Sequence, residues 1–112
     1  MTPKKNRRRS MRQERELAED TGARVQPGSG AIAGIKGDVR SRGNFRAECK
    51  FTRANSYRVD RKTLDKISSE CSFGEIPILD ISFIARNGQT EDRWVAMPYS
   101  DWITLNAAGK HS

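Results

Sequence analysis

Three side chains that together suit phosphodiester chemistry are Asp38, Glu48 and Lys50. From Phe45 to Phe51 apolar and charged residues alternate, so one face of a strand is apolar and the other carries Glu48 and Lys50. The Cα atoms of Glu48 and Lys50 would lie roughly 6.6 Å apart, within reach of one ion or phosphate. An antiparallel partner strand carrying Asp38, joined through a turn at residues 42–44, would add a second carboxylate.

Carboxylates are the hard oxygen ligands that Mg²⁺ and Mn²⁺ prefer. An ion held by Asp38 and Glu48 would polarise a scissile phosphate and lower the pKa of a bound water. Lys50 would position that water or help to deprotonate it, and would stabilise the charge that develops. The alternative interpretation is a simple ion pair on one face of a strand, because a chain with 31% charged residues produces Glu-x-Lys by chance.

The sequence lacks the residues that other common kinds of catalytic site require. With two cysteines and one histidine, His111, the chain cannot build a zinc site from two Cys and two His, and a Ser-His-Asp or Cys-His nucleophile has no credible base. The glycine-rich stretch 27–37 lacks the Lys-Ser/Thr ending of a phosphate-binding loop, so we expect no nucleotide cofactor. Ser29 in this stretch either contacts a phosphate backbone or belongs to an ordinary surface loop.

The net charge of +7 and the sequence pI near 9.9 predict a polyanionic partner, most often nucleic acid. Residues 1–15 hold seven basic side chains and one acid, so six of the seven net positive charges lie there. We interpret residues 1–9 as a flexible basic arm that binds phosphates, with a solubilising tail as the alternative. Arg53, Arg58 and Arg61 are further candidate phosphate contacts, or a solvated edge.

The 112 residues suffice for one domain, which we expect over residues 10–112. No apolar run reaches membrane-spanning length, and the basic start is not followed by the apolar core of a secretory signal. Two cysteines fit a reducing compartment. We therefore expect a soluble cytoplasmic protein without membrane association.

Ser10 and Gln13 have the spacing of a capping box and Gly22 is a natural stop, which predicts a helix over residues 10–21. Its inward stripe would include Met11, Glu14, Leu17, Ala18 and Thr21. A carboxylate within an apolar stripe is costly to desolvate unless it is paired or faces a cation. Glu14 is thus either a functional residue or the partner of a neighbouring base.

The rest of the chain predicts a short strand at 23–26, the hairpin of residues 37–51, and a helix from Asp60 to Ser72. A strand at 76–85, apolar on both faces, is followed by an Asn87-Gly88 turn, a partner strand at 94–97 and a short helix from Ser100. The predicted class is α/β: helix, three-stranded antiparallel meander, helix, two further strands and a short C-terminal helix.

This order of motifs resembles the PD-(D/E)xK nuclease superfamily, and within it the archaeal-type Holliday junction resolvases and their phage relatives. The matching segments run from Gln13-Glu14-Arg15-Glu16-Leu17 through Gly28-Ser29 and Gly37-Asp38-Val39 to Glu48-Cys49-Lys50, a helix, an apolar strand and a Trp-containing strand. The resemblance implies a restriction-endonuclease-like core and a homodimer that cuts opposed strands of a four-way junction. A phage-encoded member would act in the cytoplasm of its bacterial or archaeal host.

By position, the resemblance implies a catalytic set of Glu14, Asp38, Glu48 and Lys50. Mg²⁺, with Mn²⁺ as a substitute, would be held by Asp38, Glu48 and the main-chain carbonyl of Cys49, with Glu14 as a further candidate ligand. Arg15 and Ser29 would handle DNA. Together with the basic residues above, the candidate DNA contacts are Arg7, Arg8, Arg9, Arg12, Arg15, Ser29, Lys36, Arg53 and Arg58.

Two other functions stay open. One keeps this site but acts on duplex or flap DNA, as a nicking, homing or replication-repair endonuclease. The other is a non-catalytic nucleic-acid-binding protein whose carboxylates make only ion pairs. Candidate dimer surfaces are the apolar strand at 78–84 and the strand that carries Trp94.

Overall fold

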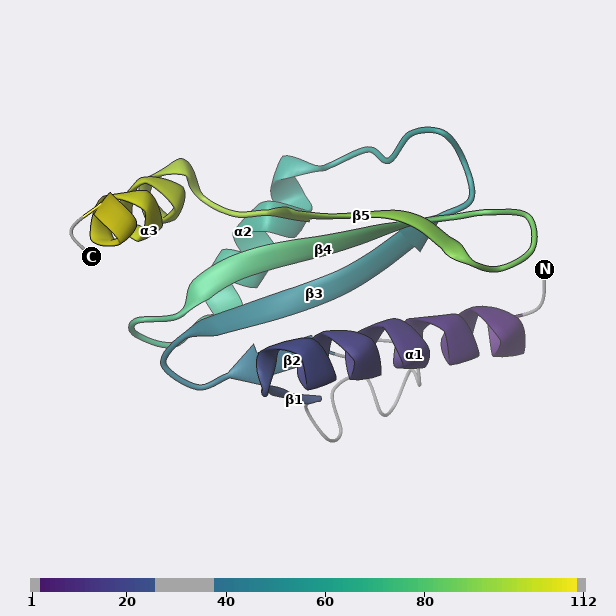
Figure 1. Cartoon of the computed structure of the whole chain (residues 1–112), viewed down its shortest axis with the longest axis horizontal. Helices are drawn as coiled ribbons and strands as arrows, with labels where there is room; N and C mark the ends of the chain where they lie inside the picture. The colour runs from purple at the N-terminus through teal and green to yellow at the C-terminus, as the bar shows by residue number, and fades with distance from the viewer. Residues whose placement is uncertain (1–2, 26–37, 111–112) are drawn as a thin grey trace.

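The computed structural model describes the backbone of residues 3–25 and 38–110 and the side chains of residues 8–25 and 39–107. The elements are α1 (Pro3–Thr21), β1 (Arg24–Val25), β2 (Asp38–Ser41), β3 (Phe45–Thr52), α2 (Arg61–Glu70), β4 (Ile76–Ile84), β5 (Thr90–Ala96) and α3 (Tyr99–Lys110) (Figure 1). The α/β class and this succession of elements agree with the prediction. Among the described residues, no helix combines the length and the apolar character needed to cross a membrane.

The described strands form one mixed sheet in the order β1-β2-β3-β4-β5. β1, β2 and β3 make the predicted antiparallel meander. β4 lies parallel to β3, and β5 returns antiparallel to β4. Parallel neighbours cannot be joined by a tight hairpin, which explains why α2 stands between β3 and β4 in the chain.

Helices α1 and α2 cover opposite faces of the sheet (Figure 1). Ala47 and Cys49 of β3 belong to the core cluster under α1. Ile67 of α2 packs on the other face, against Leu79 and Ile81 of β4. The two central strands are therefore covered on both sides, as predicted for the long apolar strand.

Two glycines make the predicted tight turns. Gly43 has a φ of 79° between β2 and β3, where the Asn44 amide donates to the Ser41 carbonyl at 2.9 Å. Gly88 has a φ of 86° between β4 and β5, and its amide donates to the Ala85 carbonyl at 2.9 Å. A residue with a Cβ would be strained at either position.

Helix α1 begins at Pro3, earlier than the predicted start at residue 10. Proline is favourable in a first helical turn, where its missing N–H needs no partner and its φ is already helical, and the Lys and Arg residues that follow are good helix formers. Residues 3–9, predicted as an arm outside the domain, thus form the first turns of α1. The capping-box interpretation of Ser10 and Gln13 is wrong, because both lie inside the helix.

The face that α1 turns toward the sheet is more polar than predicted. Glu14 is 5% exposed, and Leu17 and Ala18 pack on the core, as expected. Met11, however, is 51% exposed and Thr21 is exposed as well, whereas Gln13 is 1% exposed. The Gln13 amide is buried because it donates to main-chain oxygens of the sheet, an interaction that apolar periodicity does not reveal.

The C-terminal part of the described chain leaves large apolar side chains in solvent. β5 begins at Thr90, earlier than the predicted residue 94, and it is an edge strand. Trp94 on this strand is 65% exposed, and Tyr99 and Trp102 on α3 are 78% and 51% exposed. Exposed aromatic residues at a sheet edge mark a surface that could meet another molecule.

Arg40 and Glu75 tie the β2–β3 hairpin to the segment that precedes β4. Arg40 Nε lies 2.8 Å from Glu75 Oε2, and the Glu75 side chain has no exposed surface. Glu75 also accepts main-chain N–H bonds from Ser72 at 2.8 Å and Gly43 at 3.3 Å. The hydrogen bond from Arg40 is the main reason that the pKa of Glu75 is about 2, below its ordinary value of 4.5.

Because the folded pKa of Glu75 is depressed, its contribution to stability is complete above pH 4.5 and is lost as the pH falls toward 2. The free energy of unfolding of the wild-type protein should fall over this range more steeply than that of Glu75→Gln. Urea unfolding followed by circular dichroism measures both. Glu91→Gln, at an exposed position of β5, is the control and should keep the wild-type profile; equal profiles for the two variants would contradict this role of Glu75.

Candidate active site

The β2–β3 hairpin places Asp38 directly opposite Glu48. Directly opposed positions of an antiparallel pair share one face of the sheet, and Lys50, two residues after Glu48, shares it too. It is the face that α2 covers, because Glu48 lies beside Leu79 of the α2-facing core. The backbone thus brings positions 38, 48 and 50 together as predicted, while the side chain of Asp38 lies outside the described part.

Glu48 is buried, and its carboxylate faces a cation. Its side chain is 7% exposed, and Oε1 lies 3.2 Å from the Nζ atom of Lys66 on α2. Tyr57 lies near Glu48. The pKa of its phenol is raised mainly by burial and, to a smaller extent, by the negative charge of Glu48. The buried Glu48 carboxylate is therefore stabilised by a neighbouring positive charge. Lys66 supplies that charge in this structure, and a divalent cation at the same place would supply it too.

Glu14 approaches β3 from the other face of the sheet. Burial chiefly raises the pKa of the Cys49 thiol, and the charge of Glu14 adds to this effect. Because Cys49 points toward α1, Glu48 and Lys50 on either side of it point away. Glu14 can meet them only around the edge of β3, where the described pairing with β2 ends. The structure thus places Glu14 beside the same segment of β3 and on its opposite face.

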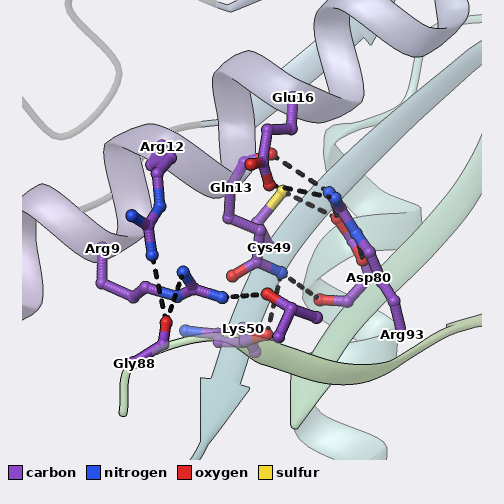
Figure 2. Close-up of polar contacts among 10 residues, drawn as sticks. Arg9, Arg12, Gln13, Glu16, Cys49, Lys50, Asp80, Gly88 and Arg93 are labelled. Carbon is purple, nitrogen blue, oxygen red and sulfur yellow. Dashed lines mark hydrogen bonds and ion pairs between the residues drawn. The ribbon is translucent and has the colours of Figure 1, made fainter. Parts of the chain in front are cut away.

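A polar cluster lies beneath α1 and consists of Gln13, Cys49, Asp80 and Arg93 (Figure 2). Asp80 is 0% exposed. Arg93 donates two hydrogen bonds to its carboxylate, from Nε to Oδ1 at 3.0 Å and from Nη2 to Oδ2 at 2.6 Å. The Cys49 thiol donates to Asp80 Oδ2 at 3.3 Å. Gln13 Nε2 donates to the main-chain oxygens of Lys50 at 2.9 Å and Asp80 at 3.2 Å. Arg93 Nη2 donates to the main-chain oxygen of Gln13 at 3.1 Å.

This α1-face cluster positions the first helix on the sheet. The Arg93 guanidinium contacts β4 and α1 at once, and a bidentate arginine–carboxylate pair has a well-defined geometry. Because Glu14 directly follows Gln13, the cluster also sets where Glu14 lies. One feature of the sequence indicates this cluster, namely the single Asp within the apolar strand at 76–85. A carboxylate buried on both faces of a sheet requires a charged partner.

Five of the nine predicted DNA contacts come together where β3 ends and β4 turns into β5. They line a hollow of about 490 Å³ with the turn residues 87–89, and we call it the arginine hollow. The five are Arg8, Arg9, Arg12, Arg15 and Arg53. Arg58 does not line it, and its exposed guanidinium lies 3.3 Å from Asp60. Ser29, Lys36 and the side chain of Arg7 lie outside the described residues.

The predicted metal site needs Asp38, whose side chain the structure does not describe. Among the side chains that it does describe, no group of three or more His, Cys, Asp or Glu residues is placed to hold a metal ion. The donors offered at positions 38 and 48 are carboxylate oxygens, which fit Mg²⁺ or Mn²⁺. Metal binding thus stays a prediction about these two residues and the Cys49 carbonyl.

Comparisons of the chain with protein-family models, with curated proteins and with solved structures find no match. The basis for a functional proposal is therefore the arrangement of the chain's own residues. Two features of it carry chemistry: the face shared by positions 38, 48 and 50, and the arginine hollow.

Replacing Arg93 by Ala should leave the Asp80 carboxylate buried without its cation. Breaking a buried pair in this way typically costs about 3–5 kcal/mol, so we expect a large fall in the free energy of unfolding. Urea unfolding of Arg93→Ala and Asp80→Asn, alone and combined, isolates the pair. Arg86→Ala, at an exposed position, is the control, and an equal effect of Arg86→Ala and Arg93→Ala would contradict the role of the cluster.

Proposed function

We propose that this protein is a metal-dependent DNA endonuclease of the PD-(D/E)xK superfamily that resolves four-way junctions. The observation that carries the proposal is the register of the central hairpin, which sets Asp38 opposite Glu48 with Lys50 next on the same face. Two carboxylates and a lysine so arranged match the requirements of phosphodiester hydrolysis. The basic character of the chain supports a nucleic acid as the substrate.

The arrangement of secondary structure is consistent with a restriction-endonuclease-like core. The antiparallel meander, the crossover through α2 and the parallel placement of β3 and β4 leave β3 inside the sheet. β4 pairs with β3 at both Glu48 and Lys50, and β2 pairs with it at Glu48, so this strand holds the two residues more rigidly than a loop would. Precise positioning matters because misplacement of a reacting group by about 1 Å can cost roughly a hundredfold in rate.

Each residue of the proposed site has a separate role. Asp38, Glu48 and the Cys49 carbonyl would hold Mg²⁺, which when bound supplies Lewis-acid polarisation of the phosphate and an activated water. Lys50 orients the attacking water and stabilises negative charge on the phosphate. Glu14 would assist from the α1 face of β3, reaching the other residues around the edge of the strand.

Lys50→Ala should bind a synthetic four-way junction with near wild-type affinity but cut it at least about a hundredfold more slowly in Mg²⁺, since removal of one such group typically costs this much. The exposed Lys62 on α2 offers a control of equal charge. Junction binding and cleavage by wild type, Lys50→Ala and Lys62→Ala should be measured at one salt concentration. Cleavage by Lys50→Ala at the wild-type rate would refute the proposed site.

The same assay separates junction resolution from the other nuclease functions. A resolvase should nick the four-way junction symmetrically and prefer it to a flap and to linear duplex. The salt concentration must be fixed because phosphate-driven affinity changes steeply with salt. A clear preference for linear duplex would favour a nicking or homing endonuclease with the same catalytic residues.

The ion pair between Glu48 and Lys66 favours the non-catalytic alternative, in which the carboxylate only balances a lysine. The two functions differ in metal binding. A nuclease should bind Mn²⁺, detectable by electron paramagnetic resonance, and Glu48→Gln should weaken this binding about tenfold or more because one charged oxygen ligand is lost. Glu70→Gln, one turn beyond Lys66 on α2, is the control; equal Mn²⁺ binding by Glu48→Gln and Glu70→Gln would support the non-catalytic function.

A homodimer would set two such sites against opposed strands of a junction. Of the two surfaces that the sequence left open, the strand at 78–84 lies between β3 and β5 and is largely buried. The exposed apolar side chains gather on β5 and α3 instead: Trp94, Val95, Tyr99, Trp102, Ile103 and Leu105. We therefore place the proposed dimer contact on β5 and α3.

A further inference from the structure

The arginine hollow is a concave anion site separate from the carboxylates of the proposed active site. All five of its charged lining residues are arginines, and no carboxylate is among the lining side chains that the structure describes. Arginine keeps its charge at any pH a protein meets. Five like charges around one concavity repel one another, so an anion placed there would be stabilising.

Arg9 gives a second, independent indication of a ligand. Arg9 is 7% exposed, and its Nε atom is buried without an acceptor among the described residues. The terminal nitrogens of Arg9 donate to the Gly88 carbonyl at 3.3 Å and to the Thr90 hydroxyl. A buried donor left without a partner is costly, and rotation of the Arg9 side chain toward an anionic oxygen in the hollow would supply an acceptor.

The hollow is preorganised by contacts with the β4–β5 turn and β3. Arg12 Nη2 donates to the same Gly88 carbonyl as Arg9, at 3.2 Å, so two guanidinium groups converge on one oxygen (Figure 2). The positive φ of Gly88 fixes the direction of that turn. The Arg53 guanidinium lies 5.1 Å from the centroid of the Phe51 ring, a distance at which a cation–π contact holds it.

The lining chemistry selects phosphate over base. No aromatic ring is among the described lining residues, so a base would lack an aromatic stacking platform, whereas guanidinium groups bind phosphate oxygens in a bidentate manner. The volume of about 490 Å³ falls within the range of small-molecule sites, which suits one nucleotide unit of a strand. Such contacts position a nucleic acid without reading its sequence.

We propose that the arginine hollow binds a backbone phosphate of a nucleic-acid strand and thereby sets the strand's path past the β3 carboxylate. That the anion belongs to a nucleic acid rests on the proposed function; the anion site itself does not. Arg53 lies just beyond the end of β3, three residues after Lys50, so their Cα atoms are at most about 11 Å apart. A nucleic-acid strand held in the hollow, on the α1 side, would reach Lys50 on the α2 side by passing around the C-terminal end of β3.

The test uses the exposed pair Arg12 and Arg53, so that folding is not at risk. Binding of a fluorescent single strand and of a four-way junction is followed by anisotropy in EDTA, over a series of salt concentrations. The double variant Arg12→Gln, Arg53→Gln should bind about tenfold to a hundredfold more weakly, and its log K against log salt should flatten by about one for each lost phosphate contact. The matched double variant Arg24→Gln, Arg42→Gln, both exposed and outside the hollow, should stay within about twofold of wild type.

Two further binding measurements identify the source of the phosphate. If the hollow holds an internal phosphate, strands with a 5′-phosphate and a 5′-hydroxyl bind equally well, and both lose affinity in the hollow variant. If it holds a strand end, the 5′-phosphate is preferred by wild type and not by the hollow variant, which revises the backbone assignment to a terminal phosphate. Inorganic phosphate should displace the strand more effectively than chloride at equal ionic strength.

Equal affinity and equal salt dependence of the two double variants would overturn the proposal. This failure is distinct from failure of the nuclease function. A protein that binds through the hollow but cuts nothing in Mg²⁺ would keep the anion site and lose the catalytic proposal. A protein that cuts junctions while the two double variants bind alike would keep the catalytic proposal and lose the hollow.

Discussion

The pair between Asp80 and Arg93 is the interaction on which the arrangement of this fold depends. A carboxylate with no exposed surface is tolerable only beside a cation, and Arg93 supplies two hydrogen bonds to it from the neighbouring strand. The same guanidinium reaches the main chain of α1 at Gln13. One buried charge pair therefore joins β4, β5 and the first helix. Its specificity is directional, because an apolar contact would allow α1 to slide or rotate, whereas a planar guanidinium allows few orientations.

The consequences of this pair extend to the proposed active site. Gln13 bonds to the main-chain oxygens of Lys50 and Asp80, so the helix is fixed to β3 and β4 beside the residues of interest. β3 then separates two environments. Its α1 face holds the Cys49 thiol, whose pKa is raised mainly by burial, and its α2 face holds Glu48 against Lys66. The carboxylates proposed for catalysis would act across one strand, with Asp38 and Glu48 on one side and Glu14 reaching around the edge.

Charge is distributed over the same scaffold in two ways. Near Glu48 the opposite charges are paired at short range, which stabilises a buried carboxylate. In the arginine hollow, by contrast, like charges gather in a concave surface, and a polyanion from outside would balance them. A strand would be drawn to the hollow, beside the C-terminal end of β3, by a field that salt weakens. The surface proposed for binding and the surface proposed for hydrolysis are thus separate, and both adjoin the C-terminal half of β3.

Local sequence determined the hairpin, the tight turns, the second helix and the order of elements. The alternation around Glu48 and Lys50, the glycines at 43 and 88, and the apolar spacing within α2 each act within a few residues, and such short-range preferences are readable from a sequence alone. Only the tertiary structure decided that Gln13 is buried, that Asp80 pairs with Arg93, and that Arg53 joins the arginines of α1. The bond from Gln13 to Asp80 spans 67 residues and that from Arg93 to Gln13 spans 80. Which of many arginines meets a buried acid depends on how helix and sheet pack, because charge attraction is the same for all of them until the fold sets the distances.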